Sequence, residues 1–174
     1  IRLEGATDVV EIQRRVQAWA AAHPEAPWVL GRGWIYGAFP GSLPHRRWLD
    51  AIVPDRPVWL RAFDGHTGWA NGRALALAGI TKDTPDPPEG EIVRDPVTGE
   101  PTGVLKEGAK ALVAKLVPEP RRGEQLAALR AALAEAARVG VVRMHSLGGG
   151  FEVLELLDEL RRGGRLPAAG VPGQ

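Results

Sequence analysis

Cysteine is absent from the chain, and other features that would mark a special class of protein are missing as well. Without thiols there are no disulfides, no thiolate nucleophile and no cysteine-based zinc site, which fits a cytoplasmic protein. No apolar run reaches the length of a membrane span, and residues 1–5 contain no apolar signal core. Lys and Arg number 22 against 21 Asp and Glu, so the net charge predicts no nucleic-acid or membrane partner.

The residues that are present predict an α/β fold. Short apolar runs alternate with amphipathic helices, an order typical of a mostly parallel sheet covered by helices. Strands are expected at 28–30, 57–63, 141–145 and 165–171, and helices at 8–22, 46–52, 72–78, 106–116, 122–139 and 151–162. We therefore predict a single α/β segment over residues 1–174, with a β-hairpin inserted at about 90–105. A complete eight-unit barrel needs about 250 residues, so this chain is short for one.

Polar side chains follow the apolar run of residues 57–63, where a strand is expected to end. Asp64 and His66 come directly after this run. A hydrogen-bonded turn would account for them, but ligands of α/β folds bind beyond the carboxyl ends of strands. Asp64 and His66 are therefore candidate catalytic acid–base residues. Trp34, Trp69 and Asn71 occupy the neighbouring loops and are the candidates for contact with substrate.

His145 ends a later strand in the same way, and Ser146 follows it. The alternative is a histidine that is hydrogen-bonded in a buried turn. Lys106 and Glu107 are expected to open a helix, where the helix dipole alone would favour a glutamate. A functional role for these two residues requires that they face the same cavity as His66.

Four segments occur in order along the chain: WVLGRGW, VPDRPVWLRAFDGHTGWANGRALALAGI, GEIVRDPVTGEPTGVLKEGA and GVVRMHSLGGG. Together they resemble the amidohydrolase superfamily, in the family 3 branch of metal-dependent hydrolases similar to N-substituted formamide deformylase. The resemblance covers roughly residues 1 to 171, which is nearly the whole chain. Several motifs in the same order are far more specific than any one of them.

The resemblance implies a hydrolase on a TIM-like (β/α)8 barrel, in which one or two divalent ions, often zinc, activate water. The substrate would be a small molecule with a non-peptide C–N bond, such as an amide or a formamide. The resemblance places His66 at the active-site cavity. It makes Glu107 the first candidate for a metal ligand and a carbamylated Lys106 the second. His145 would be a further ligand at a strand end, although this chain has Ser146 where the family more often has Asp.

The chain also departs from the family pattern. The His-x-His pair of the family's first strand does not occur in it, and later strands of the family add further His ligands and a catalytic Asp. We therefore expect an internal piece of a longer enzyme, which alone binds little metal, turns over little and self-associates. Two alternatives stay open: a non-catalytic α/β binding or assembly module, and a metal-free enzyme in which Asp64 and His66 form an acid–base pair.

Overall fold

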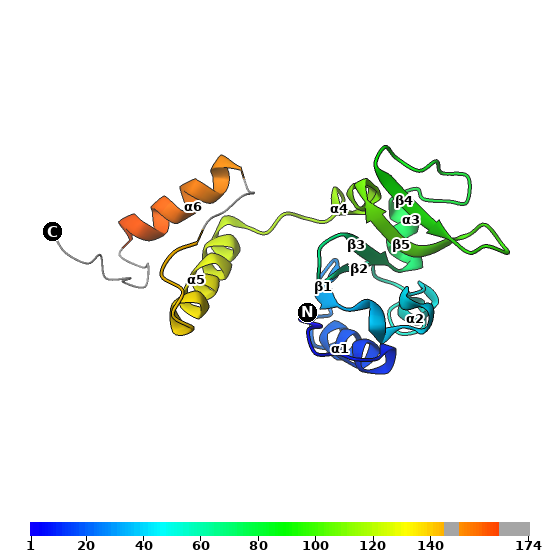
Figure 1. Cartoon of the computed structure of the whole chain (residues 1–174), viewed down its shortest axis with the longest axis horizontal. Helices are drawn as coiled ribbons and strands as arrows, with labels where there is room; N and C mark the ends of the chain where they lie inside the picture. The colour runs from blue at the N-terminus through cyan, green and yellow to red at the C-terminus, as the bar shows by residue number, and fades with distance from the viewer. Residues whose placement is uncertain (145–149, 164–174) are drawn as a thin grey trace. The chain divides into compact units, whose positions relative to one another are not determined.

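The computed structural model describes residues 1–144 and 150–163 of the chain. They form two compact units: unit 1, Ile1–Pro118, and unit 2, which begins at Glu119 (Figure 1). A single α/β segment over residues 1–174 stays a prediction. None of the helices among the described residues has both the length and the apolar character needed to cross a bilayer.

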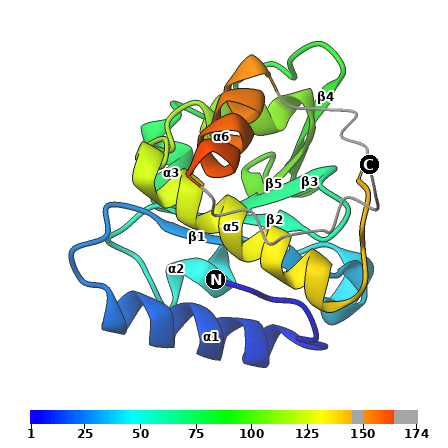
Figure 2. The ribbon, with the colours of Figure 1, turned by 90° about the vertical axis from the view of Figure 1, so that its left-hand side faces the viewer.

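Unit 1 is a sheet with helices on both faces (Figures 1 and 2). Its strands are β1 (Val29–Trp34), β2 (Val58–Ala62), β3 (Thr67–Ala70), β4 (Gly90–Arg94) and β5 (Pro101–Glu107). Its helices are α1 (Val9–Ala22), α2 (Arg47–Asp50), α3 (Gly72–Leu77) and α4 (Ala111–Ala114). Single turns of 3-10 helix lie at η1 (Tyr36–Ala38), η2 (Pro40–Ser42) and η3 (Gly108–Lys110).

The sheet is mixed, which corrects the expectation of a mostly parallel one. The strand order is β1–β2–β3–β5–β4, in which β1 and β2 are parallel and each other neighbouring pair is antiparallel. The physical reason is the tight turn at 63–66, which folds β3 directly back onto β2, whereas a parallel neighbour would need a long crossover. The predicted hairpin is confirmed as β4 and β5, but β5 continues to Glu107, where a helix was expected to begin.

Alternation along β2 gives the sheet two different apolar faces. Val58 and Leu60 point to the α1 face, which packs against α1 and α2. Trp59 points to the α3 face, which packs against α3 and α4. The Trp59 ring covers Gly68 of β3, where an added Cβ would lie 1.9 Å from the ring. Residues 67–70, expected to be loop, are therefore a buried central strand.

Helix α1 begins as the sequence predicts. The Asp8 carboxylate accepts a hydrogen bond from the backbone N–H of Glu11 at 2.8 Å. A reciprocal capping box, in which Glu11 would bind the backbone N–H of Asp8, does not form, because the Glu11 carboxylate binds Arg14 and Arg15 instead. Those hydrogen bonds, with Arg14 as the larger influence, lower the pKa of Glu11 to about 2.

Unit 2 contains the two helices predicted for it, α5 (Arg122–Arg138) and α6 (Phe151–Arg162). Leu156 and Leu160 of α6 are buried, and Arg122 forms an ion pair with Glu159 at 2.8 Å. The prediction of a strand at 141–145 is wrong for residues 141–144, which the structure describes and which are not in a strand. An apolar run forms a strand only where another strand bonds to it, which local propensity does not reveal. The strand predicted at 165–171 lies outside the described residues.

Candidate functional site

The Asp64–His66 motif forms the turn of the β2–β3 hairpin. The Asp64 Oδ1 atom accepts a hydrogen bond from the backbone N–H of His66 at 2.9 Å. Gly65 has a φ of 77°, a conformation that glycine adopts without steric cost. The Lys110 ammonium of η3 donates a hydrogen bond to the Gly65 carbonyl. The sequence therefore places an acid and a glycine here to build a turn that presents His66.

The structure brings His66 and Glu107 together, although 41 positions separate them in the sequence. The His66 Nδ1 atom lies 2.8 Å from Glu107 Oε1, and the backbone N–H of Glu107 donates to the His66 carbonyl at 2.9 Å. Both side chains remain accessible, with exposed fractions of 66% and 56%. An ionised carboxylate only accepts hydrogen bonds, so Nδ1 is the donor. Among the described residues, the Nε2 atom of His66 has no protein partner, which leaves it available as a base.

Glu107 has an unusual backbone conformation, with φ 45° and ψ −123°. Left-handed φ values are costly for residues with a Cβ, typically by about 1 to 3 kcal/mol, and persist where surrounding contacts enforce them. Here the constraints are the hydrogen bond from Glu107 N–H to His66 and the one from Gly108 N–H to the Glu89 carbonyl at 3.0 Å. The conformation occurs where β5 ends, at the residue that contacts the imidazole. Such strain is common at functional sites.

Asp64 contacts the backbone of His66, while the His66 ring pairs with Glu107. The second carboxylate oxygen of Asp64 accepts a hydrogen bond from the Tyr36 hydroxyl at 3.0 Å. That hydroxyl also lies 2.8 Å from the Thr67 hydroxyl. Burial is the main cause that raises the pKa of Tyr36, and the bond to Asp64 adds to it. Asp64 therefore holds the turn in place, and Tyr36, which the sequence analysis did not single out, supports it.

Lys106 lies apart from the His66–Glu107 pair. Its ammonium group binds Glu91 Oε2 across the hairpin at 2.9 Å. Neighbouring residues of a strand point to opposite faces, so Lys106 and Glu107 diverge at the end of β5. The expectation that they open a helix is wrong, because the strand continues through both. His145, the other predicted metal ligand, lies outside the described residues, as does Ser146.

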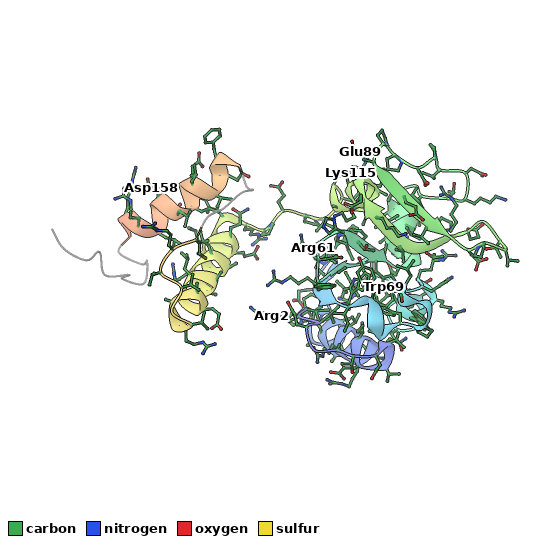
Figure 3. The ribbon with its side chains drawn as sticks, in the orientation of Figure 1. Arg2, Arg61, Trp69, Glu89, Lys115 and Asp158 are labelled. Carbon is green, nitrogen blue, oxygen red and sulfur yellow. The ribbon has the colours of Figure 1, made fainter. Side chains whose placement is uncertain are left out.

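The two predicted substrate-binding tryptophans are fully buried in unit 1. The Trp34 indole N–H donates to the Leu60 carbonyl at 3.1 Å, and its ring packs edge-on against Tyr36, Phe39 and Trp69. Figure 3 shows Trp69 in the interior of unit 1. Their burial argues against direct contact with substrate.

Asn71 is also fully buried and has a structural role. Its Oδ1 atom accepts hydrogen bonds from the N–H groups of Val58 at 3.0 Å and Ala74 at 2.9 Å. Its Nδ2 atom donates to the carbonyls of Val53 and Arg56, both at 2.8 Å. The amide thus caps α3 and joins it to β2, which leaves no polar atom for a ligand.

The described residues do not supply a complete metal centre. They contain no group of three or more His, Cys, Asp or Glu side chains placed to hold an ion. His66 and Glu107 offer two donors at most, whereas protein zinc sites use three or four protein ligands. Any metal bound near this pair would need ligands from elsewhere.

Comparison with known proteins gives consistent matches. The pattern of the Amidohydrolase family matches residues 1–171. Protein LONG AFTER FAR-RED 3 of Arabidopsis thaliana is 38% identical over 87% of this chain and 26% of its own length. Putative amidohydrolase YtcJ of Bacillus subtilis is 39% identical over 71% of this chain and 23% of its own. N-substituted formamide deformylase of Arthrobacter pascens is 46% identical over 40% of this chain and 13% of its own length.

The fold is also similar to that of a solved structure. An uncharacterized metal-dependent hydrolase from Pyrococcus horikoshii OT3 aligns with a TM-score of 0.58 and 24% identity, over 95% of this chain and 31% of that one. The two curated relatives with the longest matches have 26% and 23% of their length covered, so the chain spans about a quarter of them.

Proposed function

The chain belongs to the amidohydrolase family, and we propose that it is a segment of a metal-dependent enzyme that hydrolyses a C–N bond. The bond we propose is a non-peptide bond of amide or formamide type in a small molecule, which the similarity to N-substituted formamide deformylase supports. The observation that carries the proposal is the accessible His66–Glu107 pair, held by a strained backbone.

In this proposal each residue of the pair has a distinct task. The Glu107 carboxylate accepts a hydrogen bond from the Nδ1–H group of His66 and thereby fixes both the tautomer and the ring orientation. The Nε2 atom is then free to accept a proton from a nucleophile and to return it to the departing nitrogen. Asp64 keeps the turn that carries the imidazole in position.

The complete enzyme provides the setting for this chemistry. We propose a TIM-like (β/α)8 barrel, to which the parallel strands β1 and β2 contribute neighbouring positions. We propose a divalent cation, zinc first, as its cofactor, with most ligands outside the described residues. The lack of cysteine supports a cytoplasmic location, and the balanced charge supports the absence of a nucleic-acid or membrane partner. Exposed apolar side chains of unit 2 support self-association.

Kinetics of the complete enzyme on a series of N-substituted formamides test the proposal. His66→Asn and Glu107→Gln should lower kcat by about 10²-fold or more, because acid–base catalysis typically contributes about 10²- to 10⁴-fold. His23→Asn is the matched control, since His23 stacks on Trp19 at the end of α1. Wild-type turnover in both site variants would refute the proposal. Absence of turnover in the wild type as well would favour a non-catalytic binding or assembly module.

A further inference from the structure

Three arginines form a row across neighbouring strands of unit 1. The backbone of Arg2 forms an isolated parallel β-bridge with Arg32 of β1. In the parallel register of β1 and β2, Arg32 is the partner of Arg61. Paired residues of adjacent strands point to the same face, so the three side chains leave the sheet together. They alternate with Leu3 and Leu60, which are buried on the α1 face, so the row lies on the α3 face. Figure 3 shows Arg2 and Arg61 on the same side of unit 1.

The positive charge of this row is only partly neutralised. Arg32 approaches Glu4 Oε1 at 3.8 Å, and both side chains are more than half exposed. Within the described residues, the guanidinium groups of Arg2 and Arg61 form no hydrogen bond or ion pair. Like charges directly opposite one another destabilise a sheet. A row of three such residues therefore lowers stability, and a bound anion would offset that cost.

The arginine row is adjacent to the candidate site. Arg61 is paired with Gly68, and His66 lies two residues before Gly68 on the same chain. His66 closes the turn before β3, and its ring contacts Glu107, which lies on β5 two residues after Leu105 of the α3 face. Arg61 and the His66–Glu107 pair are therefore on the same face of the sheet. Leu30, which is two residues before Arg32 and partly exposed, adds an apolar surface beside the guanidinium groups.

We propose that Arg2, Arg32 and Arg61 bind the carboxylate of an anionic amide substrate. This inference rests on the function proposed above and narrows its substrate class. A guanidinium group presents paired N–H donors that match the two oxygens of a carboxylate, and the planar fork suits bidentate binding. A substrate held by its carboxylate on this row would extend along the same face toward the Nε2 atom of His66.

Calorimetric titration of the 174-residue chain with two matched probes tests the inference. N-formylphenylalanine carries a carboxylate, and N-formyl-2-phenylethylamine is the same amide without it. The acid should bind about tenfold more tightly at low salt, because a charge-assisted hydrogen bond contributes on that order. Arg61→Gln and Arg32→Gln should each remove most of this preference. Arg73→Gln, at an exposed position of α3, is the control and should retain it.

Binding does not require turnover, so the result is independent of whether the chain is catalytic. Equal binding of the two probes by the wild type would overturn the inference. So would a full preference in Arg61→Gln that has a wild-type circular dichroism spectrum. Inorganic phosphate that binds as tightly as N-formylphenylalanine would overturn the assignment to a carboxylate.

Discussion

Glu107 combines a strained backbone with an exposed side chain that contacts His66. Nothing about folding requires glutamate at this position, since glycine would adopt the same φ without a Cβ clash. We predict that Glu107→Gly raises the free energy of unfolding of the chain by about 1 kcal/mol, measured by urea denaturation.

Glu89 is the matched control for this prediction, because it also has a positive φ, of 54°, but does not contact His66. Glu89→Gly should raise stability similarly and leave turnover of the complete enzyme intact, whereas Glu107→Gly should lose it. A lower free energy of unfolding in Glu107→Gly would contradict the prediction, because it would show that the Glu107 side chain stabilises the fold.

Asn71 is the opposite case, a polar residue kept for stability. Truncation to alanine leaves two backbone N–H groups and the Val53 carbonyl buried without this partner, and the part-buried Arg56 carbonyl loses it as well. We predict that Asn71→Ala lowers the free energy of unfolding by about 3 to 5 kcal/mol, since each unsatisfied buried group costs about 1 to 3 kcal/mol and the costs overlap. A loss under about 1 kcal/mol in thermal or urea unfolding would contradict this assignment.

At the residue scale, the imidazole after an apolar strand marked His66 as a candidate, and the resemblance to the family marked Glu107. The structure brings these two side chains into contact. Sequence reasoning could not separate these from Trp34, Trp69 and Asn71, since adjacency in sequence does not reveal burial. Tyr36 was missed because its role depends on a contact with Asp64, 28 positions away.

Among the elements, the long helices α1, α5 and α6 and the β4–β5 hairpin could be predicted, because their periodicity and turn residues are local signals. Strand β3 could not, since it is short, contains Gly68 and begins directly after a polar turn. Its strand conformation comes from hydrogen bonds to β2 and β5. Because β3 was not predicted, the sheet was expected to be mostly parallel. In the structure, the antiparallel pairing of β3 with β2 and β5 makes the sheet mixed.

The β4–β5 hairpin should be sensitive to acid. Hydrogen bonds from the backbone N–H groups of Thr98 and then Val97 lower the pKa of Asp95 in the turn. A folded pKa below the unfolded value of about 4 means that the stabilisation is present above that pH and lost as the pH falls through the folded pKa. We predict that amide protection in this hairpin declines below about pH 4, and that Asp95→Asn removes this dependence. Hydrogen exchange followed by NMR checks the result, and an unchanged acid profile in Asp95→Asn would exclude Asp95 as the cause.

At the scale of the whole molecule, unit 2 has more exposed apolar surface than its two helices can cover. Val142 and Phe151 are each 84% exposed, and no residue of α5 is buried. We predict that the 174-residue chain self-associates through this surface, and that Val142→Lys with Phe151→Asp shifts it toward monomer in sedimentation velocity. Val97→Lys is the control, because Val97 is 90% exposed but lies in the hairpin of unit 1. A monomeric wild type at high concentration would refute the prediction.

The proposed role of His66 as a base requires a proton on its Nδ1 atom, and 15N NMR of the labelled chain measures the position of that proton directly. We predict that neutral His66 carries its proton on Nδ1, directed at the Glu107 carboxylate, and that Glu107→Gln shifts the tautomer balance toward Nε2–H. A proton on Nε2 in the wild type, unchanged by Glu107→Gln, would show that Glu107 does not prepare His66 as a base.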